Sequence, residues 1–332
     1  MLGGGYSAVV LRHATKEDVF ALATEDDIVA QRSPKLVTKS GTVVAFKMIT
    51  PRPSGNGVSD MLRKSEAFRT ICQEIKVCCH PLLRSHENIS GILYVAWQRS
   101  EDFPWLALDL AAFGTLEDVL TAPGEGPTHK QKLNLTVDVA LGVMALHRAG
   151  IIHGDLKPAN ILVHHCQDSD RQIVGKVTDF GGSISIGHGS PSIGTPLWCA
   201  PEVAATITNT DWKLADVWSY GLIVASIWSH IPLSGRSSSS CYLDRLIPQH
   251  LEGSARNARL FLIKTEPDSS AGSIISHCMY FPSAVRLLLS STLSCLPVRR
   301  LDFNTLISRY LSLICEDLDR ESVMNTIHSI HA

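Results

Sequence analysis

An acid, a cation and an amide stand at fixed offsets in the stretch HGDLKPANILV, which covers residues 153–163. Asp155 could accept the proton of a hydroxyl group, Lys157 could neutralise charge that develops on a phosphate, and Asn160 could bind a hard cation through its side-chain oxygen. Apolar runs flank these residues, so the pattern predicts a loop followed by a strand. Three such groups on one short turn suit phosphoryl transfer.

A further aspartate, Asp179, lies in the stretch VTDFGG at residues 177–182. The polar run HHCQDSDR at residues 164–171 precedes it and predicts an enlarged hairpin tip between two strands. Asp179 therefore follows the strand after Asn160 and its hairpin.

A lysine lies within the β-rich run TVVAFKMI at residues 42–49. Val, Ile, Phe and Thr favour strands, so we expect a strand that carries Lys47. Taken alone, Lys47 could equally be a surface lysine whose alkyl chain covers apolar surface. A Pro-, Gly- and Ser-rich stretch at residues 51–57 then predicts a loop before the next helix.

That helix is expected at about residues 61–79, where Ile71 and Cys78 belong to an apolar stripe at helical spacing. Glu74 follows Ile71 by three residues and precedes Cys78 by four, so it lies beside this inward stripe. Glu66 is the alternative for a functional glutamate. Either residue could also be merely solvated, as most helical glutamates are.

The sequence predicts two more helices. Residues 129–147 show an amphipathic pattern that Gly150 ends, directly before the loop. Residues 211–230 are apolar on nearly every side, which predicts a buried helix with Asp216 inside it.

The stretch at residues 153–160 resembles the catalytic loop of eukaryotic protein kinases, H-R-D-L-K-x-x-N, with Gly154 in place of the arginine. Other segments resemble further kinase motifs, and they occur in kinase order. These are the glycine-rich loop at residues 2–11, V-A-x-K at 44–47, H-P-N-I at 86–89, D-F-G at 179–181, G-T-x-x-[WY]-x-A-P-E at 194–202, D-V-W-S-x-G at 216–221 and C-L-x-x-D-P-x-x-R-P at 293–301.

The resemblance covers about residues 2–311 and implies an α+β, bilobal protein-kinase-like fold. We expect a single protein kinase domain over residues 1–332, with a small β-sheet lobe with one main helix at residues 1–110 and a larger, mostly helical lobe at residues 111–332. Because the glycine-rich loop begins at residue 2, most of the strand that normally precedes it would be missing. Either the chain is truncated or that sheet edge is unusually short.

The resemblance also implies a nucleotide site for ATP. Lys47 would hold the α- and β-phosphates and pair with Glu74, and the backbone of Leu110 and Ala111 would hydrogen-bond the adenine edge, with Leu108 as gatekeeper. The implied nucleotide-binding residues are Gly3, Gly5, Val10, Ala45, Lys47, Glu74, Asp109, Ala111, Leu162 and Asp179.

The implied chemistry is Mg²⁺-dependent transfer of the γ-phosphate of ATP to a protein substrate. Asn160 and Asp179 would hold the metal, Asp155 would accept or orient the substrate hydroxyl proton, and Lys157 would stabilise charge on the transferred group. Lys157 together with Thr195 favours serine/threonine over tyrosine substrates, and the segment at residues 194–202 leans towards the tyrosine-kinase-like group of serine/threonine kinases.

Two structural pairings follow from the resemblance. Arg300 would pair with Glu202, although Leu296 and Leu301 depart from the family pattern around it. Asp216 would anchor the backbone of the catalytic loop from within its buried helix.

In kinases that carry the arginine, its guanidinium binds a phosphate on the activation segment, the stretch after D-F-G that residues 194–202 close in this sequence. Gly154 supplies no such group. We therefore hypothesise that activity does not require phosphorylation there. The segment nevertheless offers hydroxyl groups at Ser183, Ser185, Ser190, Ser192 and Thr195.

Two alternatives stay open. Aminoglycoside- and choline-type small-molecule kinases share the His-Gly-Asp pattern, but they lack the segments at residues 194–202 and 216–221 that dock peptides. A pseudokinase or nucleotide-binding scaffold is suggested by Ser7 and Ala8 in the glycine-rich loop and by Leu296, although Lys47 and the loop residues are present.

Composition sets the outer limits of function. A formal net charge of −2 gives no electrostatic footprint for nucleic acid, and no apolar run reaches the ~20 residues of a membrane span. Nine scattered cysteines without a CxxC pair favour reduced thiols, and hence a soluble protein of the cytoplasm or nucleus.

Overall fold

The structure is a computed structural model that describes part of the chain. The described residues are 8–13, 44–49, 60–96, 102–122, 124, 126–166, 171–189, 194–204, 210–228, 281–294 and 296–311. Gly3, Gly5 and the expected first turn of the glycine-rich loop lie outside them.

Four antiparallel strands form the sheet of the smaller lobe, in the order β1-β2-β4-β3. They are β1 (Ala8–His13), β2 (Val44–Ile49), β4 (Trp105–Asp109) and β3 (Ile92–Ala96). Lys47 lies at the centre of this sheet, since β1 and β4 pair with β2 on either side of it.

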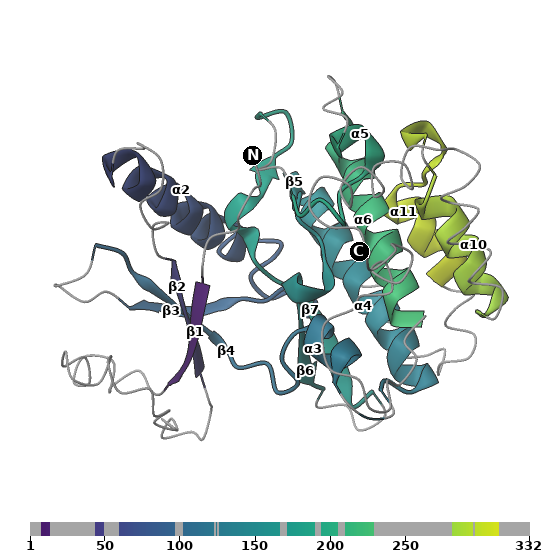
Figure 1. The fold of residues 1–332 in the computed structure, drawn as a ribbon, viewed down its shortest axis with the longest axis horizontal. Coiled ribbons are helices and arrows are strands. Elements are labelled where there is room, and N and C mark those ends of the chain that lie inside the picture. Colours follow the sequence, from purple (N-terminus) through teal and green to yellow (C-terminus); the bar gives the residue numbers. More distant parts are fainter. Residues whose placement is uncertain are drawn as a thin grey trace, which may run out of the picture.

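One long helix, α2 (Asp60–Cys78), lies beside the sheet (Figure 1). Ala67 and Ile71 of α2 pack with Leu106 of β4 in a small buried cluster. Ile71 of the expected stripe thus faces the sheet, whereas Cys78 is buried in the larger core cluster. The helix begins and ends one residue earlier than expected.

The larger lobe is mostly helical and is built around α4 (His129–Arg148) and α6 (Trp212–Trp228). Every described residue of α6 from Ala215 onwards is buried, in agreement with its uniformly apolar sequence. The hydroxyl of Tyr220 donates to the carbonyl of Thr136 at 3.1 Å, which joins the two helices through a satisfied polar contact.

Shorter elements complete this lobe and hold the loops. They are α3 (Leu116–Thr121), β5 (Ile151–Ile152), η1 (Pro158–Asn160), β6 (Ile161–His165), β7 (Ile173–Val177), η2 (Phe180–Gly182), β8 (Ile184–Ser185), α5 (Pro201–Ala204), α10 (Ser283–Thr292), η3 (Pro297–Arg299), α11 (Phe303–Leu306) and the π-helical turn η4 (Ile307–Leu311). The expected hairpin is present, because β6 pairs with β7 in antiparallel register.

Capping residues fix where α4 begins. The Thr128 side chain accepts a hydrogen bond from the Gln131 amide, and the Gln131 side chain accepts one from the Thr128 amide. At the other end, Gly150 has a φ of 74°, a left-handed conformation that favours glycine. The helix therefore delivers the chain into β5 and the loop after it.

The observed arrangement confirms the α+β, bilobal class expected from the sequence. Among the described residues, none of the helices combines the length and the apolar character that a membrane crossing requires.

Candidate active site

Lys47 joins the two lobes. Its Nζ lies 3.1 Å from Oε1 of Glu74 in α2 and 2.8 Å from Oδ1 of Asp179, the residue before η2. The lysine side chain is buried, and Glu74 is 1% exposed. The expected pairing of Lys47 with Glu74 is present, whereas Glu66 is exposed on α2.

Lys47 and Asp179 stabilise each other's charged forms. Burial alone would lower the pKa of Lys47, but Glu74 and Asp179 outweigh it and raise that pKa above its ordinary value. For Asp179, burial favours a higher pKa, and the charge and hydrogen bond of Lys47 outweigh it so that the pKa falls below its ordinary value. Lys47 and Asp179 therefore stay charged near neutral pH.

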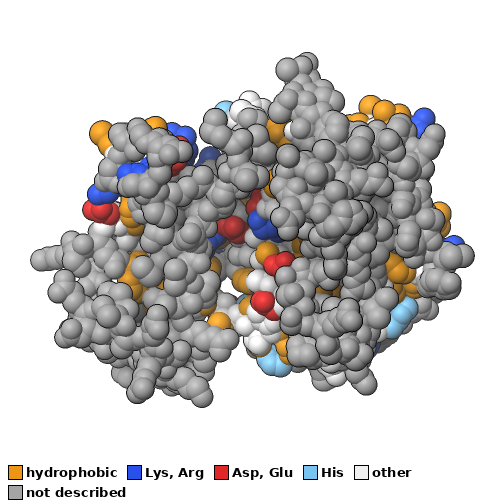
Figure 2. Space-filling view, in the orientation of Figure 1, with side chains coloured by type: hydrophobic (Ala, Val, Ile, Leu, Met, Phe, Trp, Pro, Cys, Tyr) orange, Lys and Arg blue, Asp and Glu red, His pale blue; other side chains and the backbone are white. Residues whose placement is uncertain are grey.

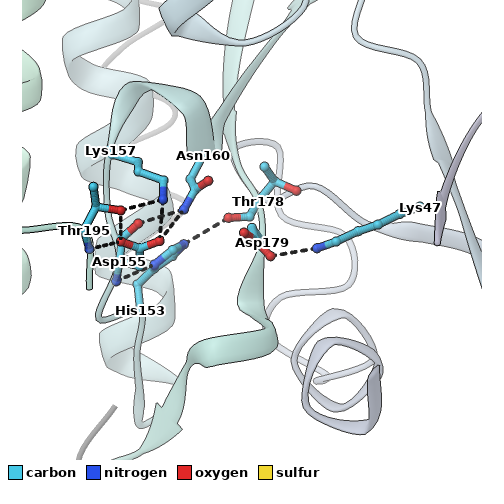
Figure 3. A network of polar contacts seen from close by, with 8 residues as sticks. All are labelled: Lys47, His153, Asp155, Lys157, Asn160, Thr178, Asp179 and Thr195. Atoms are coloured by element: carbon cyan, nitrogen blue, oxygen red, sulfur yellow. Dashed lines mark hydrogen bonds and ion pairs between the residues drawn. The ribbon is translucent and has the colours of Figure 1, made fainter. Parts of the chain in front are cut away.

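Asp155 is held by the activation segment. Its Oδ1 accepts hydrogen bonds from the Thr195 amide at 2.7 Å and the Thr195 hydroxyl at 2.9 Å. Lys157 Nζ donates to Asp155 Oδ2 and to Thr195 Oγ1, both at 2.7 Å. Figure 3 shows these three side chains converging in one closed network. Both Asp155 and Lys157 thus have fixed orientations.

The side-chain nitrogen and the side-chain oxygen of Asn160 point in different directions (Figure 3). Its Nδ2 donates to the carbonyl oxygen of Asp155 at 2.8 Å and faces Asp155 Oδ2 at 3.4 Å. The side-chain oxygen points away from Asp155 (Figure 3). An amide oxygen and the carboxylate of Asp179 are hard donors of the kind that Mg²⁺ prefers.

Backbone contacts tie the catalytic loop to the strand that leads to Asp179. The Thr178 amide donates to the Asn160 carbonyl at 3.0 Å, and His153 Nε2 lies 3.0 Å from the Thr178 carbonyl oxygen. His153 Nδ1 accepts from the Asp155 amide at 3.2 Å, so Nε2 must be the donor to Thr178. His153 was not among the expected site residues.

Asp216 anchors the loop from within α6, as expected. Its Oδ2 accepts from the His153 amide at 3.0 Å, and its Oδ1 accepts from the Gly154 amide at 2.9 Å. His147 Nε2 lies 2.9 Å from Oδ2, a contact that sequence reasoning missed. The buried carboxylate is thereby satisfied on both oxygens.

Two glycines meet where the activation segment passes over the loop. A Cβ at Gly194 would lie 2.5 Å from the carbonyl oxygen of Gly154, closer than real Cβ contacts allow. Gly194 must therefore be glycine for Thr195 to reach Asp155.

Glu202 and Arg300 hold together two distant parts of the larger lobe. Arg300 Nη1 and Nη2 bind the two carboxylate oxygens of Glu202 at 2.6 and 2.8 Å, and both residues are buried. The expected pair is thus present despite Leu296 and Leu301. Trp218 lies under the Arg300 guanidinium, 5.0 Å from it.

Of the expected nucleotide-binding residues that the structure describes, Val10 and Ala45 lie on the strands around Lys47, and Asp109 and Ala111 lie at the lobe connection. Val10 pairs with Lys47 in the β1–β2 register, and Ala45 pairs with Leu108 across β2 and β4. Asp109 ends β4, and Ala111 is buried just after it. Leu162 of β6 bridges to Thr115, which brings β6 to the start of α3.

Figure 2, in the orientation of Figure 1, shows acidic (red) and basic (blue) side chains where the two lobes meet. Acidic and basic groups therefore line the groove between the lobes.

The hydroxyl groups expected on the activation segment differ in environment. Ser183 is 5% exposed and hydrogen-bonded, so it is not the available acceptor that the sequence suggested. Thr195 is engaged by Asp155 and Lys157, and Ser190 and Ser192 lie outside the described residues.

Residues 35–310 match the family model of the protein kinase domain, and the chain belongs to this family. Over 155 residues it is 30% identical to serine/threonine-protein kinase pakF of Dictyostelium discoideum, which covers 46% of this chain and 12% of that protein. It is 32% identical over 187 residues to serine/threonine-protein kinase 4 homolog A of the same organism, covering 55% and 35%. It is 28% identical over 237 residues to serine/threonine-protein kinase TOS3 of Saccharomyces cerevisiae, covering 64% and 40%. The matches thus span less than half of each of these relatives.

Proposed function

We propose that this chain is a serine/threonine protein kinase that transfers the γ-phosphate of ATP to a protein hydroxyl with Mg²⁺. The main support for the proposal is that two clusters of charged side chains, one around Lys47 and one around Asp155, lie together in one site. Lys47 meets Asp179 at 2.8 Å, and the Asp155–Lys157–Thr195 network lies beside it, linked through the backbone of Thr178.

The lysine cluster binds the nucleotide. Lys47 is directed by Glu74 and holds the α- and β-phosphates, because a buried cation fixed by a carboxylate loses little freedom when an anion binds. We also assign nucleotide contacts to the remaining predicted set, Gly3, Gly5, Val10, Ala45, Asp109, Ala111 and Leu162.

Asn160 and Asp179 suit a magnesium ion, since one contributes an amide oxygen and the other a carboxylate. When bound, such an ion neutralises negative charge on the phosphates. Asp179 has φ 68° and ψ 65°, a left-handed conformation that is uncommon for aspartate and turns the chain at this residue.

The loop cluster acts on the acceptor. Asp155 orients the substrate hydroxyl and accepts its proton, while Lys157 stabilises charge on the transferred group. Thr195 fixes both side chains before the substrate arrives, so the transition state requires little reorganisation.

A protein acceptor is favoured over a small molecule. The Glu202–Arg300 pair and the Asp216 anchor support the segments that small-molecule kinases lack. We further propose that residues 1–332 form a single kinase domain, with lobes at residues 1–110 and 111–332, and that its partners do not include nucleic acid.

A comparison of acceptors tests the proposal. The chain is incubated with ATP and Mg²⁺ and either a generic basic protein or a mixture of aminoglycosides and choline. We expect phosphoserine and phosphothreonine in the protein and no phosphorylated metabolite. Transfer to the metabolites alone would contradict a protein kinase.

A further inference from the structure

Ser183 closes the turn that follows Asp179. Its amide donates to the carbonyl oxygen of Phe180 at 3.0 Å, and its hydroxyl donates to the same oxygen at 2.7 Å. The side chain is buried. The hydroxyl therefore locks η2 in shape from inside the protein.

Gln73 of α2 reaches this hydroxyl from the other lobe, with Nε2 3.1 Å from Ser183 Oγ. A hydroxyl group has one hydrogen, and Ser183 gives it to Phe180. The partner on α2 must then be a donor. The amide group of Gln73 meets this requirement, whereas a carboxylate of the same shape would not.

The contact lies beside the lysine cluster. Gln73 precedes Glu74 in α2, and a Cβ at Gly181 would lie 2.3 Å from Cγ2 of Thr70. The helix thus rests directly on η2. Phe180 is fully buried, and its ring packs edge-on against His153 of the catalytic loop at 5.8 Å between ring centroids.

We propose that Gln73 and Ser183 are positioning residues that form a relay from α2 to Phe180 and hold Glu74 and Asp179 together at Lys47. This inference rests on the proposed kinase function. It adds the contact that keeps Glu74 and Asp179 aligned at Lys47. Gly154 provides no guanidinium to order the activation segment through a phosphate. A direct hydrogen bond between α2 and η2 provides order without modification.

The sharpest variant is Gln73→Glu, which keeps the shape and removes the donor. A carboxylate draws the Ser183 hydrogen away from Phe180, so both hydrogen bonds of the relay change. We expect a kcat about 3- to 10-fold lower, which corresponds to the loss of one hydrogen bond, with the KM for the protein substrate unchanged. A role in packing alone predicts a kcat within twofold of wild type.

Ser183→Ala tests the second member. It should lower kcat by a similar factor, and Gln73→Glu should then have no further effect in the Ser183→Ala background. If the fold-decrease in kcat of the double variant equalled the product of the two single fold-decreases, Gln73 and Ser183 would act independently, which would overturn the relay. Ser65→Glu is the matched control, because it adds the same charge at an exposed position of α2.

Hydrogen exchange separates this inference from the kinase proposal. In Gln73→Glu and Ser183→Ala, we expect amides at residues 180–186 to exchange about 3- to 10-fold faster, while those of α4 keep the wild-type rate. Unchanged exchange at residues 180–186 would overturn the relay. Hydrogen exchange can be measured without any phosphoryl transfer. The kinase proposal would instead fail if the wild-type chain showed no phosphoryl transfer.

Discussion

The amide of Gly154 donates a 2.9 Å hydrogen bond to Oδ1 of Asp216, and Gly154 holds a φ of 77° to do so. The family pattern has arginine here, which would adopt this left-handed conformation only with strain. Glycine at position 154 therefore lacks a group that could bind phosphate, but it adopts the positive φ without backbone strain. The sequence indicated the first consequence but gave no sign of the second.

Gly154→Ala should lower the free energy of unfolding by about 1 kcal/mol, because a Cβ is strained at positive φ. Gly150→Ala is the matched control for stability, since Gly150 has a φ of 74° and nothing within 4 Å of the added Cβ. Chemical denaturation should give similar losses for both. A Gly154→Ala variant as stable as the wild type would show that the conformation carries no strain.

Phosphatase treatment should leave the rate of phosphoryl transfer within about twofold of that of the untreated protein. The reason is that position 154 lacks the guanidinium that would read a phosphate. Combined replacement of Ser185, Ser190 and Ser192 by alanine should give the same result. Loss of activity in both experiments would show that the segment must be phosphorylated.

Glu74→Gln should lower kcat/KM for ATP by about tenfold or more, because a neutral amide no longer directs the Lys47 charge. Glu66→Gln provides the matched control on the same helix, where the side chain is exposed. Steady-state kinetics with varied ATP measures both. Equal effects of the two substitutions would remove Glu74 from the site.

His164 should make stability depend on pH. It is 8% exposed in β6, and its Nε2 is buried without a hydrogen-bond partner among the described residues. Burial, with a smaller effect of Lys176, lowers its pKa from 6.5 to about 4. The unfolded chain then takes up a proton at a higher pH than the folded chain, so stability falls as pH drops below 6.5.

At pH 5 this loss should amount to about 2 kcal/mol relative to pH 8, and His164→Leu should lack it. His165→Leu, at the exposed neighbouring position, is the matched control and should retain the wild-type dependence. Denaturation series at the two pH values measure the difference. Parallel pH profiles for wild type and His164→Leu would contradict the burial argument.

Local pattern was sufficient for much of the site. Helical spacing put Glu74 on the inward side of α2, and β propensity put Lys47 on a strand, so their meeting could be expected. The protein kinase family and the bilobal fold are confirmed. The preference for the tyrosine-kinase-like group stays a prediction.

Contacts that depend on the path of the chain could not be expected in the same way. Gln73 and Ser183 are 110 positions apart, and no periodicity marks either residue. His147 is the partial exception, since it lies three residues after Met144 on the apolar side of its helix and faces Asp216. Helix α4 ended one residue later than expected, because the backbone geometry at Ala149 and Gly150 decides where it stops.

The central claim is that Lys47, Asp155, Asn160 and Asp179 form a working phosphoryl-transfer site. The most direct test is Mg²⁺-dependent phosphorylation of a generic protein substrate by the wild type and by Asp179→Asn, with Asp102→Asn as the exposed control. We predict that Asp179→Asn loses at least about 100-fold in rate while Asp102→Asn keeps the wild-type rate. Equal residual activity in the wild type and Asp179→Asn would contradict catalysis at this site.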